Sequence, residues 1–449
     1  MEATQLWTLW QARLEPYADA FTRPGFRRFV EWTTGLALNV EEHTITQSLI
    51  GLERPGDWKN LENFAEYGTW DRQAVERITA EQLETAPGRL WHGFHVWAGD
   101  DTKVHRSGPH VWGTCTFHEY TARCPNRAST VRAHNWVVLG ALLHNPDQPA
   151  HFVPLAGRLY FRSSQLPQAD RGPAVTFRTK NELLVELARQ QAAALPGRHL
   201  LVVDGAFAVG SLVRPLVRPE AGLPRIDVLT RLRHDARLYE LPPLKQAGQP
   251  GRQPLWGRRL PPPRQGGRWP NSWREGQAFL YGRVRPVRWK EVFGLWRVAG
   301  HQVVVLAVVA HVAGYKKRFT LVTTAALLSG LQVVELFCAR FRQEDGFRDL
   351  KQQLGWEECR AWTRQPIEVT TLALFVTLVL LRQLQWGLAA CGIDDWWLRP
   401  PWNARKTRPS VLDVERLLRR HRVGIQHGLS DWLESEEKIV PAEEWAMAM

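Results

Sequence analysis

Apolar residues recur at spacings of three and four along the first 90 residues. The segments 25–32 (GFRRFVEW) and 61–67 (LENFAEY) show this most clearly, and the spacing predicts amphipathic helices because about 3.6 residues complete one helical turn. Short helices joined by tight turns are typical of helix-turn-helix DNA-binding units, and a plain helical subdomain fits the pattern equally well. We therefore expect a helical N-terminal domain over residues 1–90.

The pattern changes near residue 91, where short apolar runs are separated by Gly, Pro and Asn. These runs predict strands at 94–99, 111–117, 136–143, 152–161 and 225–233. Residues 181–195 return to helical spacing, and a short helix is expected near Ala206. The run 199–203 (HLLVV) is apolar throughout, as in a strand that is buried on both faces. Strands that alternate with helices favour an α/β fold.

The second half of the chain continues with two β-rich runs and three helical segments. Residues 302–312 and 318–324 predict strands, and residues 329–353 predict one long helix. A second helix is expected at about 367–386 and an amphipathic stretch at 410–420. The longest apolar run, 372–381, is shorter than the roughly 20 residues that span a bilayer. We therefore expect no membrane-spanning segment.

The composition points to a polyanionic partner. The chain has 449 residues with a net charge of +13 and a pI near 9.9, and such a balance favours nucleic acid. The N-terminus is acidic and interrupted, unlike a signal peptide, and the five Cys are scattered. Scattered cysteines suit reduced thiols in a cytoplasm, so we expect a cytoplasmic protein.

Nearly all the excess charge lies in one segment. Residues 211–300 contain 18 Lys and Arg against 6 Asp and Glu, whereas the other 359 residues carry a net charge of +1. The stretch 251–275 (GRQPLWGRRLPPPRQGGRWPNSWRE) is rich in Pro, Gly, Arg and Trp, which excludes a regular helix and predicts an extended basic loop or ribbon. Arginine binds phosphates and tryptophan stacks on exposed bases. The alternative interpretation is a solvated linker.

Three carboxylates carry the candidate chemistry. Asp100 and Asp204 each follow an apolar strand, where open sheets place their functional groups, although an Asp there also caps the next helix. In a continuous helix, Phe337, Arg340, Glu344 and Lys351 share one face because they lie three, four and seven residues apart. An acid between two cations suits a carboxylate that holds a metal ion beside phosphates. Surface ion pairing is the alternative.

The order strand-Asp, strand-Asp, basic insertion, helix-Glu resembles the DDE transposases of bacterial insertion sequences. Phe337-x2-Arg340-x3-Glu344-x6-Lys351 is similar to the Tyr-Arg-Glu-Lys (YREK) signature of one group, with Phe in place of Tyr. Residues 231–235 (RLRHD), 319–324 (FTLVTT) and 372–384 also resemble that group. In the family the first acid lies two residues before a Thr or Ser. Thr102 therefore favours Asp100 over its neighbour Asp101, which the alternation of a strand turns to the other face.

The resemblance implies a ribonuclease-H-like catalytic core that is interrupted by a β-rich basic insertion. The implied organisation begins with a helical N-terminal DNA-binding domain at 1–90. The core follows in two segments, at 91–232 and 326–390, which the insertion at 233–325 separates. The C-terminal region is expected to be helical and to end in a tail at 391–449. It also implies that Asp100, Asp204 and Glu344 hold two Mg²⁺ or Mn²⁺ ions, with Asp101 as the alternative to Asp100. The residues implied to contact DNA are Phe337, Arg340, Lys351, Arg231 and Phe319.

The implied function is a DNA transposase that cleaves the ends of an insertion sequence and joins them to target DNA. Its partner is double-stranded DNA, namely the terminal inverted repeats and the target DNA. A homodimer would bind this DNA in the bacterial cytoplasm, in association with the nucleoid. No membrane takes part. Relatives with the signature cut the second strand through a DNA hairpin whose flipped base rests on an aromatic residue, at the place of Phe319. Trp289 and Trp296 are alternatives for that aromatic, and core packing is a further reading for all three. Two other functions stay open, a catalytically inactive DNA-binding derivative and a metal-dependent nuclease that cuts without joining.

Overall fold

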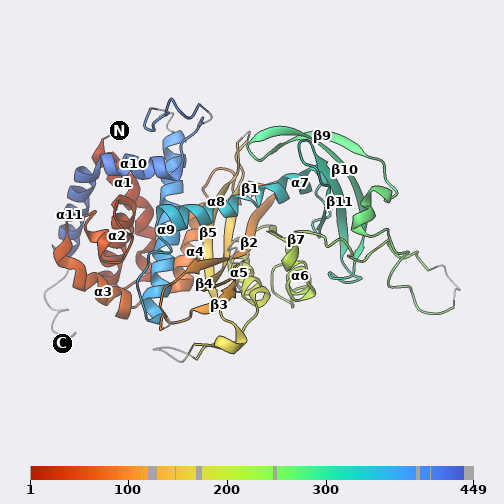
Figure 1. The fold of residues 1–449 in the computed structure, drawn as a ribbon, viewed down its shortest axis with the longest axis horizontal. Helices are drawn as coiled ribbons and strands as arrows, with labels where there is room; N and C mark the ends of the chain where they lie inside the picture. Colours follow the sequence, from red (N-terminus) through yellow and green to blue (C-terminus); the bar gives the residue numbers. More distant parts are fainter. Residues whose placement is uncertain are drawn as a thin grey trace.

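A large mixed sheet, covered by helices and continued at one end by a helical body, forms the molecule (Figure 1). The computed structural model describes residues 2–108, 110–119, 129–146, 148–167, 174–245, 250–390, 395–404 and 406–438. The mixed α/β class that the sequence predicts is confirmed.

The first 90 residues are helical, as their apolar spacing predicts. They form α1 (Ala3–Leu14), α2 (Arg23–Leu38), α3 (Trp58–Tyr67) and α4 (Arg72–Leu83). Local sequence sets where these helices begin. Thr22 caps α2 by accepting a hydrogen bond from the Gly25 N–H, and Asp71 caps α4, which satisfies N–H groups that lack a partner in the first turn.

Helices from the far end of the chain complete the same body. They are α9 (Arg364–Ala390), α10 (Val411–Arg420) and α11 (Arg422–Lys438). Helix α11 packs against α1, and both α9 and α10 pack against α2, so the two ends of the chain lie at the same end of the molecule (Figure 1). The segment expected as a C-terminal tail thus includes two packed helices.

Five strands form the centre of the sheet, in the order β5-β4-β2-β6-β7. They are β2 (Phe94–His105), β4 (Thr130–Leu143), β5 (His151–Tyr160), β6 (His199–Val203) and β7 (Ile226–Arg231). Strands β6 and β7 run parallel to β2, whereas β4 is antiparallel to both β2 and β5. This arrangement is compatible with the expected ribonuclease-H-like core. The strand expected at 111–117 is shorter, as β3 (Cys115–His118), and β1 (Leu90–Trp91) pairs with β2.

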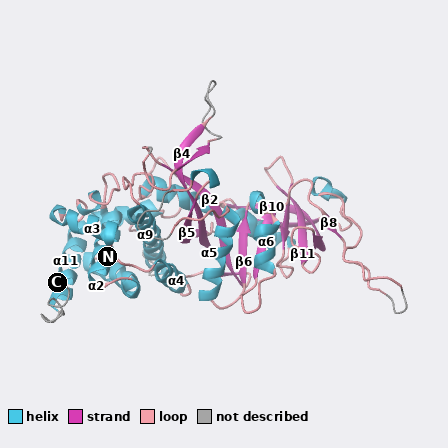
Figure 2. Ribbon diagram, turned by 90° about the horizontal axis from the view of Figure 1, so that it is seen from below, coloured by secondary structure: helices cyan, strands magenta, loops and turns pink. Residues whose placement is uncertain are grey.

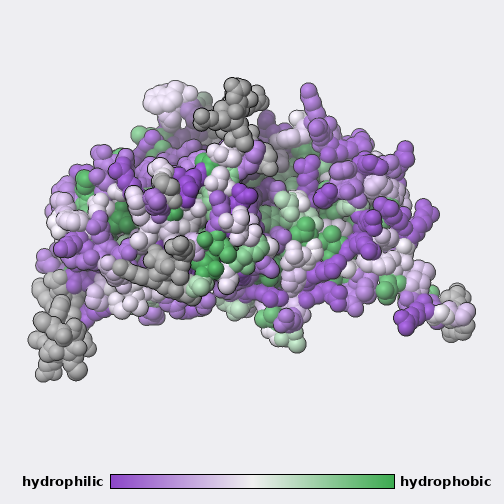
Figure 3. All heavy atoms as spheres, turned by 60° about the horizontal axis from the view of Figure 1, so that its bottom comes forward, coloured by the Kyte–Doolittle hydropathy of each residue, from purple (hydrophilic) through white to green (hydrophobic). Residues whose placement is uncertain are grey.

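The basic segment extends this same sheet. Beyond β7 come β12 (Phe319–Thr323), β11 (Val304–Val312), β10 (Arg283–Trp296) and β8 (Leu238–Tyr239), with β9 (Arg274–Leu280) on β10. The Pro- and Arg-rich stretch before β9 is irregular, as predicted, but Leu260 and Trp269 within it are buried. Residues 260–269 are therefore packed structure and not a solvated linker. Hydrophilic side chains cover much of this end of the molecule (Figure 3).

Helices cover both faces of the sheet. On one face lie α5 (Lys180–Ala194) and α6 (Gly210–Val217) (Figure 2). The other face carries α7 (Gly330–Ala339), α8 (Arg342–Arg348) and α9. Strand β6 shows the alternation directly, because Leu200 and Val202 belong to one hydrophobic core and Leu201 and Val203 to the other. Its fully apolar sequence follows from burial on both faces.

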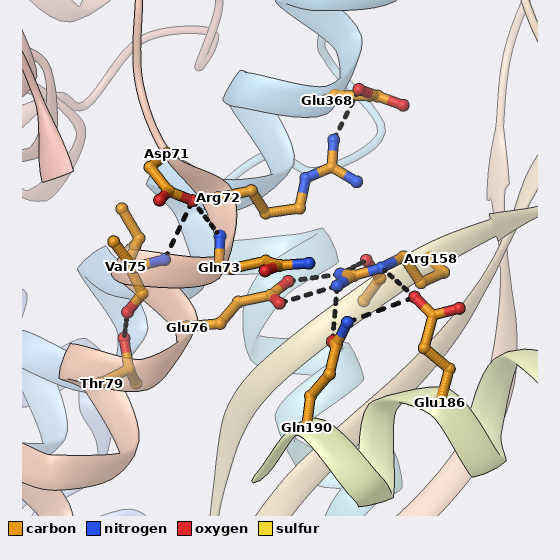
Figure 4. Close-up of polar contacts among 12 residues, drawn as sticks. Asp71, Arg72, Gln73, Val75, Glu76, Thr79, Arg158, Glu186, Gln190 and Glu368 are labelled. Carbon is orange, nitrogen blue, oxygen red and sulfur yellow. Dashed lines mark hydrogen bonds and ion pairs between the residues drawn. The ribbon is translucent and has the colours of Figure 1, made fainter. Parts of the chain in front are cut away.

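A buried ion pair joins the N-terminal helices to the sheet (Figure 4). Arg158 of β5 forms two hydrogen bonds to Glu76 of α4, at 2.5 and 2.9 Å. It also contacts Glu186 and Gln190 of α5. Because one guanidinium serves α4 and α5 together, loss of Glu76 would leave a desolvated charge at this junction.

The longest apolar run and three of the cysteines can be located in the structure. Helix α9 has the length and composition of a membrane-spanning helix, yet 94% of its most apolar window is buried inside the molecule, so it serves as a core helix. Cys115, Cys338 and Cys359 are free thiols. Cys124 and Cys391 lie outside the described residues.

Candidate active site

Asp100 and Asp204 lie side by side at one edge of the parallel part of the sheet. The parallel ladder between β2 and β6 ends at the pair Gly99 and Val203, and each Asp is the next residue. The two carboxylates interact, since Asp204 contributes to raising the pKa of Asp100. The prediction that this strand ends at Gly99 is wrong, because β2 continues to His105 along β4.

Asp100 and its neighbour Asp101 face different partners. Oδ2 of Asp100 accepts a hydrogen bond from Arg340 at 3.0 Å. Oδ2 of Asp101 instead accepts one from Lys180, the first residue of α5, at 2.6 Å. This division is what the alternation of side chains along a strand produces. Asp100 therefore faces the helix that follows the insertion, and Asp101 faces α5.

The environment of Asp100 is poorly solvated. Burial raises the pKa of Asp100 to about 6, although Arg340 and the Asp101 N–H both oppose this shift. The neighbouring carboxylates of Asp101 and Asp204 raise it further. Two acids brought together in a desolvated place, with one cation beside them, form an arrangement that is common at functional sites.

Three of the predicted DNA-contacting residues, Arg340, Phe337 and Phe319, form a continuous series of contacts that begins at Asp100. The guanidinium of Arg340 lies 5.9 Å from the ring of Phe337. Phe337 in turn stacks on Phe319 of β12, with ring centroids 6.3 Å apart. The chain Phe319–Phe337–Arg340–Asp100 thus crosses from the insertion strands to the central sheet. Of the alternative aromatics, Trp289 and Trp296 are buried, which fits packing.

The helix predicted for 329–353 is present over that range but is interrupted. Helix α7 ends at Ala339, a turn at Arg340 and Phe341 follows, and α8 leads into a π-helical turn at Asp349–Gln353. A close approach holds α8 on β5, because a Cβ at Gly346 would lie 2.2 Å from Cδ1 of Phe152. The four signature residues therefore do not lie on one continuous helical stripe, and their shared face does not follow from regular spacing.

Lys351 and Glu344 lie farther along this broken segment. Lys351 donates a hydrogen bond to the carbonyl of Lys103 and lies 3.6 Å from Glu357. Since Arg340 also contacts β2, the segment that carries Glu344 is held along that strand at both ends. Glu344 itself is exposed. The roles of Glu344 and Lys351 in metal and DNA binding stay predictions.

A basic cavity of about 420 Å³ opens beside Asp204. It is lined by Gly205, which follows Asp204, by Arg231 and by Phe319. The structure thus brings two of the predicted DNA-contacting residues, Arg231 and Phe319, close to Asp204. Three further cations that sequence reasoning had not assigned to the site also line this cavity: Arg233, Arg264 and Arg318.

Arg318 also belongs to an aromatic and cationic cluster around Trp273. Its guanidinium lies 4.9 Å from the Trp273 ring, and Lys290 and Arg288 lie 5.6 and 5.8 Å from it. Arg318 directly precedes Phe319 in the sequence. An arginine next to an aromatic at the start of a strand was the signal available for finding it.

The carboxylates fit a hard divalent cation in donor type, since Mg²⁺ and Mn²⁺ prefer oxygen ligands. Asp204 accepts the Ala206 N–H through Oδ1, and Asp100 accepts the Asp101 N–H through its own Oδ1. A cation on Oδ2 of Asp100 would take the place of Arg340. In the part of the chain that the structure describes, no three His, Cys, Asp or Glu side chains are grouped to hold a metal ion. Asp100 and Asp204 thus fit as two ligands.

The chain was compared with known protein families and with curated proteins. Residues 16–293 match the family model described as DDE superfamily endonuclease. The match covers more than half of the chain and includes Asp100 and Asp204, and it ends before the segment that carries Phe337, Arg340, Glu344 and Lys351. A search of curated proteins found no match.

Proposed function

Because the chain belongs to the DDE superfamily of endonucleases, we propose that it is a DNA transposase, which cleaves the ends of an insertion sequence and transfers the freed strands to target DNA. The observation that carries this proposal is the pair Asp100 and Asp204 on adjacent parallel strands. The pairing of Asp100 with Arg340, from the signature segment, supports it. Such a site acts on phosphodiester bonds without a Ser, Tyr or Cys nucleophile, so no covalent protein–DNA intermediate is expected.

Asp100 and Asp204 would hold the divalent cations, with Glu344 as the proposed third carboxylate. Bound Mg²⁺ or Mn²⁺ supplies Lewis-acid stabilisation of the attacking and leaving oxygens. Arg340, released from Asp100, would bind a phosphate next to the scissile bond. Lys351 would hold the backbone one step farther along β2.

The basic cavity gives the DNA a path to the carboxylates. Arg231 and Phe319 line it beside Gly205, so a strand that enters over β7 and β12 would reach Asp204. Arginine neutralises the phosphates and Phe319 offers a ring on which a base can stack. We further propose that a homodimer carries the two element ends, which are the terminal inverted repeats.

A metal-dependent endonuclease that cuts without joining is the second candidate. The description of the matched family, which names an endonuclease and no joining step, favours it. The two candidates differ in one product. A transposase converts a cleaved end with a free 3′-hydroxyl into a joined product on target DNA, whereas a nuclease leaves it unjoined.

Cleavage by an Asp204→Ala variant tests the proposal. The substrate is DNA that carries the inverted repeats flanking the coding region, with Mg²⁺ present. We expect cleavage to fall by on the order of a thousandfold or more while DNA binding changes less than about threefold, because one carboxylate ligand is lost and the basic surface is intact. Unchanged cleavage would remove Asp204 from the mechanism and contradict the proposal.

A further inference from the structure

A second cationic cavity lies away from the carboxylate edge. Its volume is about 380 Å³, and it is bounded by α8, α9, Asn403 and residues 406–411. Helix α8 contributes Arg342 and Asp345, and α9 contributes Arg382. None of the residues that the sequence assigns to metal or DNA lines it. The cavity therefore requires an explanation of its own.

The cavity holds more positive than negative charge. Five cationic side chains line it against two carboxylates. Asp345 is shared by Arg342 and Arg348, at 2.6 and 2.9 Å, and Asp349 pairs with Arg382 at 2.9 Å. The cations are Arg342, Arg348, Arg382, Lys406 and Arg408.

Of these five cations, Arg408 is not paired with a carboxylate in the described part of the chain. Lys406 is satisfied by Asp413, at 2.6 Å, whereas Arg408 forms no ion pair among the residues that the structure describes. The buried Nε atom of Arg382 also has no hydrogen-bond partner within the described chain. Guanidinium groups that converge without enough acceptors are costly unless an anion joins them.

The titration of neighbouring groups agrees with this crowding of positive charge. Burial, followed by the proximity of Arg342 and Arg382, lowers the pKa of Arg408. Burial and three of these arginines lower the pKa of His151, which also lines the cavity, to about 3. Both effects are consistent with the crowding of these cations around the cavity.

We propose that this cavity binds a phosphate group, with Arg342, Arg382 and Arg408 as its donors. A guanidinium presents a planar fork of N–H donors that matches two phosphate oxygens, and three forks suit a dianion better than a carboxylate. The phosphate belongs either to a DNA backbone or to a free phosphate or phosphomonoester. The chemistry of the site is the same for both sources.

Thermal melting of the full chain in inorganic phosphate tests the site. At about 10 mM phosphate, compared with chloride at equal ionic strength, we expect the melting temperature to rise by about 2 °C or more, because a ligand of the folded state stabilises it. Arg408→Gln should lose most of that rise. Arg416→Gln is the matched control, since it removes one exposed cation of α10 that does not line the cavity.

An equal response of the wild type and Arg408→Gln would overturn the proposal, because general salt effects on stability do not depend on one arginine. Arg408 is partly exposed on a loop, so its variant is expected to fold. Calorimetric titration of phosphate into the wild-type protein gives an independent test. The absence of a saturable heat would also overturn the proposal.

The source of the phosphate follows from DNA binding as a function of salt. A DNA backbone phosphate in the cavity predicts that Arg408→Gln lowers the slope of log K against log salt by about 0.9, and that Arg416→Gln does not. An unchanged slope together with the lost phosphate response indicates a free phosphate. Neither result depends on DNA cleavage, so this site and the proposed transposase activity stand or fall separately.

Discussion

The structure and the sequence signature indicate two different roles for a single residue, Arg340. In the structure it pairs with Asp100 and lies over Phe337, whereas the signature predicts that it binds DNA. The two are compatible if Arg340 neutralises the poorly solvated Asp100 until a metal ion and a phosphate replace that contact. A cation near a metal-bound carboxylate is best placed with a phosphate between them.

Arg340→Ala distinguishes a phosphate-binding residue from a purely structural one. We expect single-turnover cleavage to fall by on the order of a hundredfold, because a donor beside the reacting bond is lost, with little change in melting temperature. Lys351→Ala, tested in parallel, should behave similarly if it too binds the backbone. Normal cleavage with a lowered melting temperature would show that these signature residues serve the fold alone.

The sequence pattern predicted that Asp100 and Asp204 follow apolar strands, but it did not predict which side chains they contact. Thr102 and strand alternation separate Asp100 from Asp101, and in the structure their side chains contact different elements. The contact of Lys180 with Asp101, and that of Arg318 with Trp273, could not be predicted. These contacts join residues that are far apart in the sequence, so only the tertiary fold brings them together.

At the scale of elements, the segment after Ser329 shows where periodicity fails. Its residues suit a continuous helix, yet the chain turns at Arg340 and ends in a π-helical turn. The contact of Gly346 with Phe152 and the bond from Lys351 to Lys103 are tertiary. Such contacts override local propensity and are not encoded in local spacing. The helices at 181–195 and 367–386, which are packed along their length, were predicted closely.

The basic segment makes a separate prediction at this scale. Replacing Arg258, Arg259, Arg264 and Arg268 with Ala should weaken nonspecific DNA binding and lower the slope of log K against log salt by about 0.9 per lost phosphate contact. All four side chains are exposed, so the fold should be retained. An unchanged slope, measured by fluorescence anisotropy, would place the DNA path elsewhere.

At the scale of the whole molecule, the two ends of the chain form one helical body, and Glu415 of α10 is fully buried within it. Burial raises the pKa of Glu415 from 4.5 to about 8, against the effect of Arg419, whose Nη2 lies 3.4 Å away. The folded state therefore retains a proton that the unfolded chain loses. The corresponding stability is fully present below pH 4.5 and is lost as the pH rises through about 8.

Glu415→Gln should remove this pH dependence. Between about pH 5 and pH 8 the wild type is expected to lose up to about 1.4 kcal/mol of unfolding free energy per pH unit from this group, and the Gln variant should not. Urea unfolding at several pH values measures the difference. Parallel profiles for the two proteins would show that Glu415 is ionised in the folded state.

The central claim is that the edge formed by β2 and β6 performs metal-dependent DNA cleavage through Asp100. The most direct test compares Asp100→Asn with Asp101→Asn in single-turnover cleavage of a cognate end with Mg²⁺. Asp100→Asn should reduce cleavage by on the order of a thousandfold or more, because a metal ligand is lost. Asp101→Asn, which removes the ion pair with Lys180 and a secondary contribution to the pKa of Asp100, should cleave within about tenfold of the wild type. Efficient cleavage by Asp100→Asn, or loss of cleavage in Asp101→Asn alone, would contradict the account.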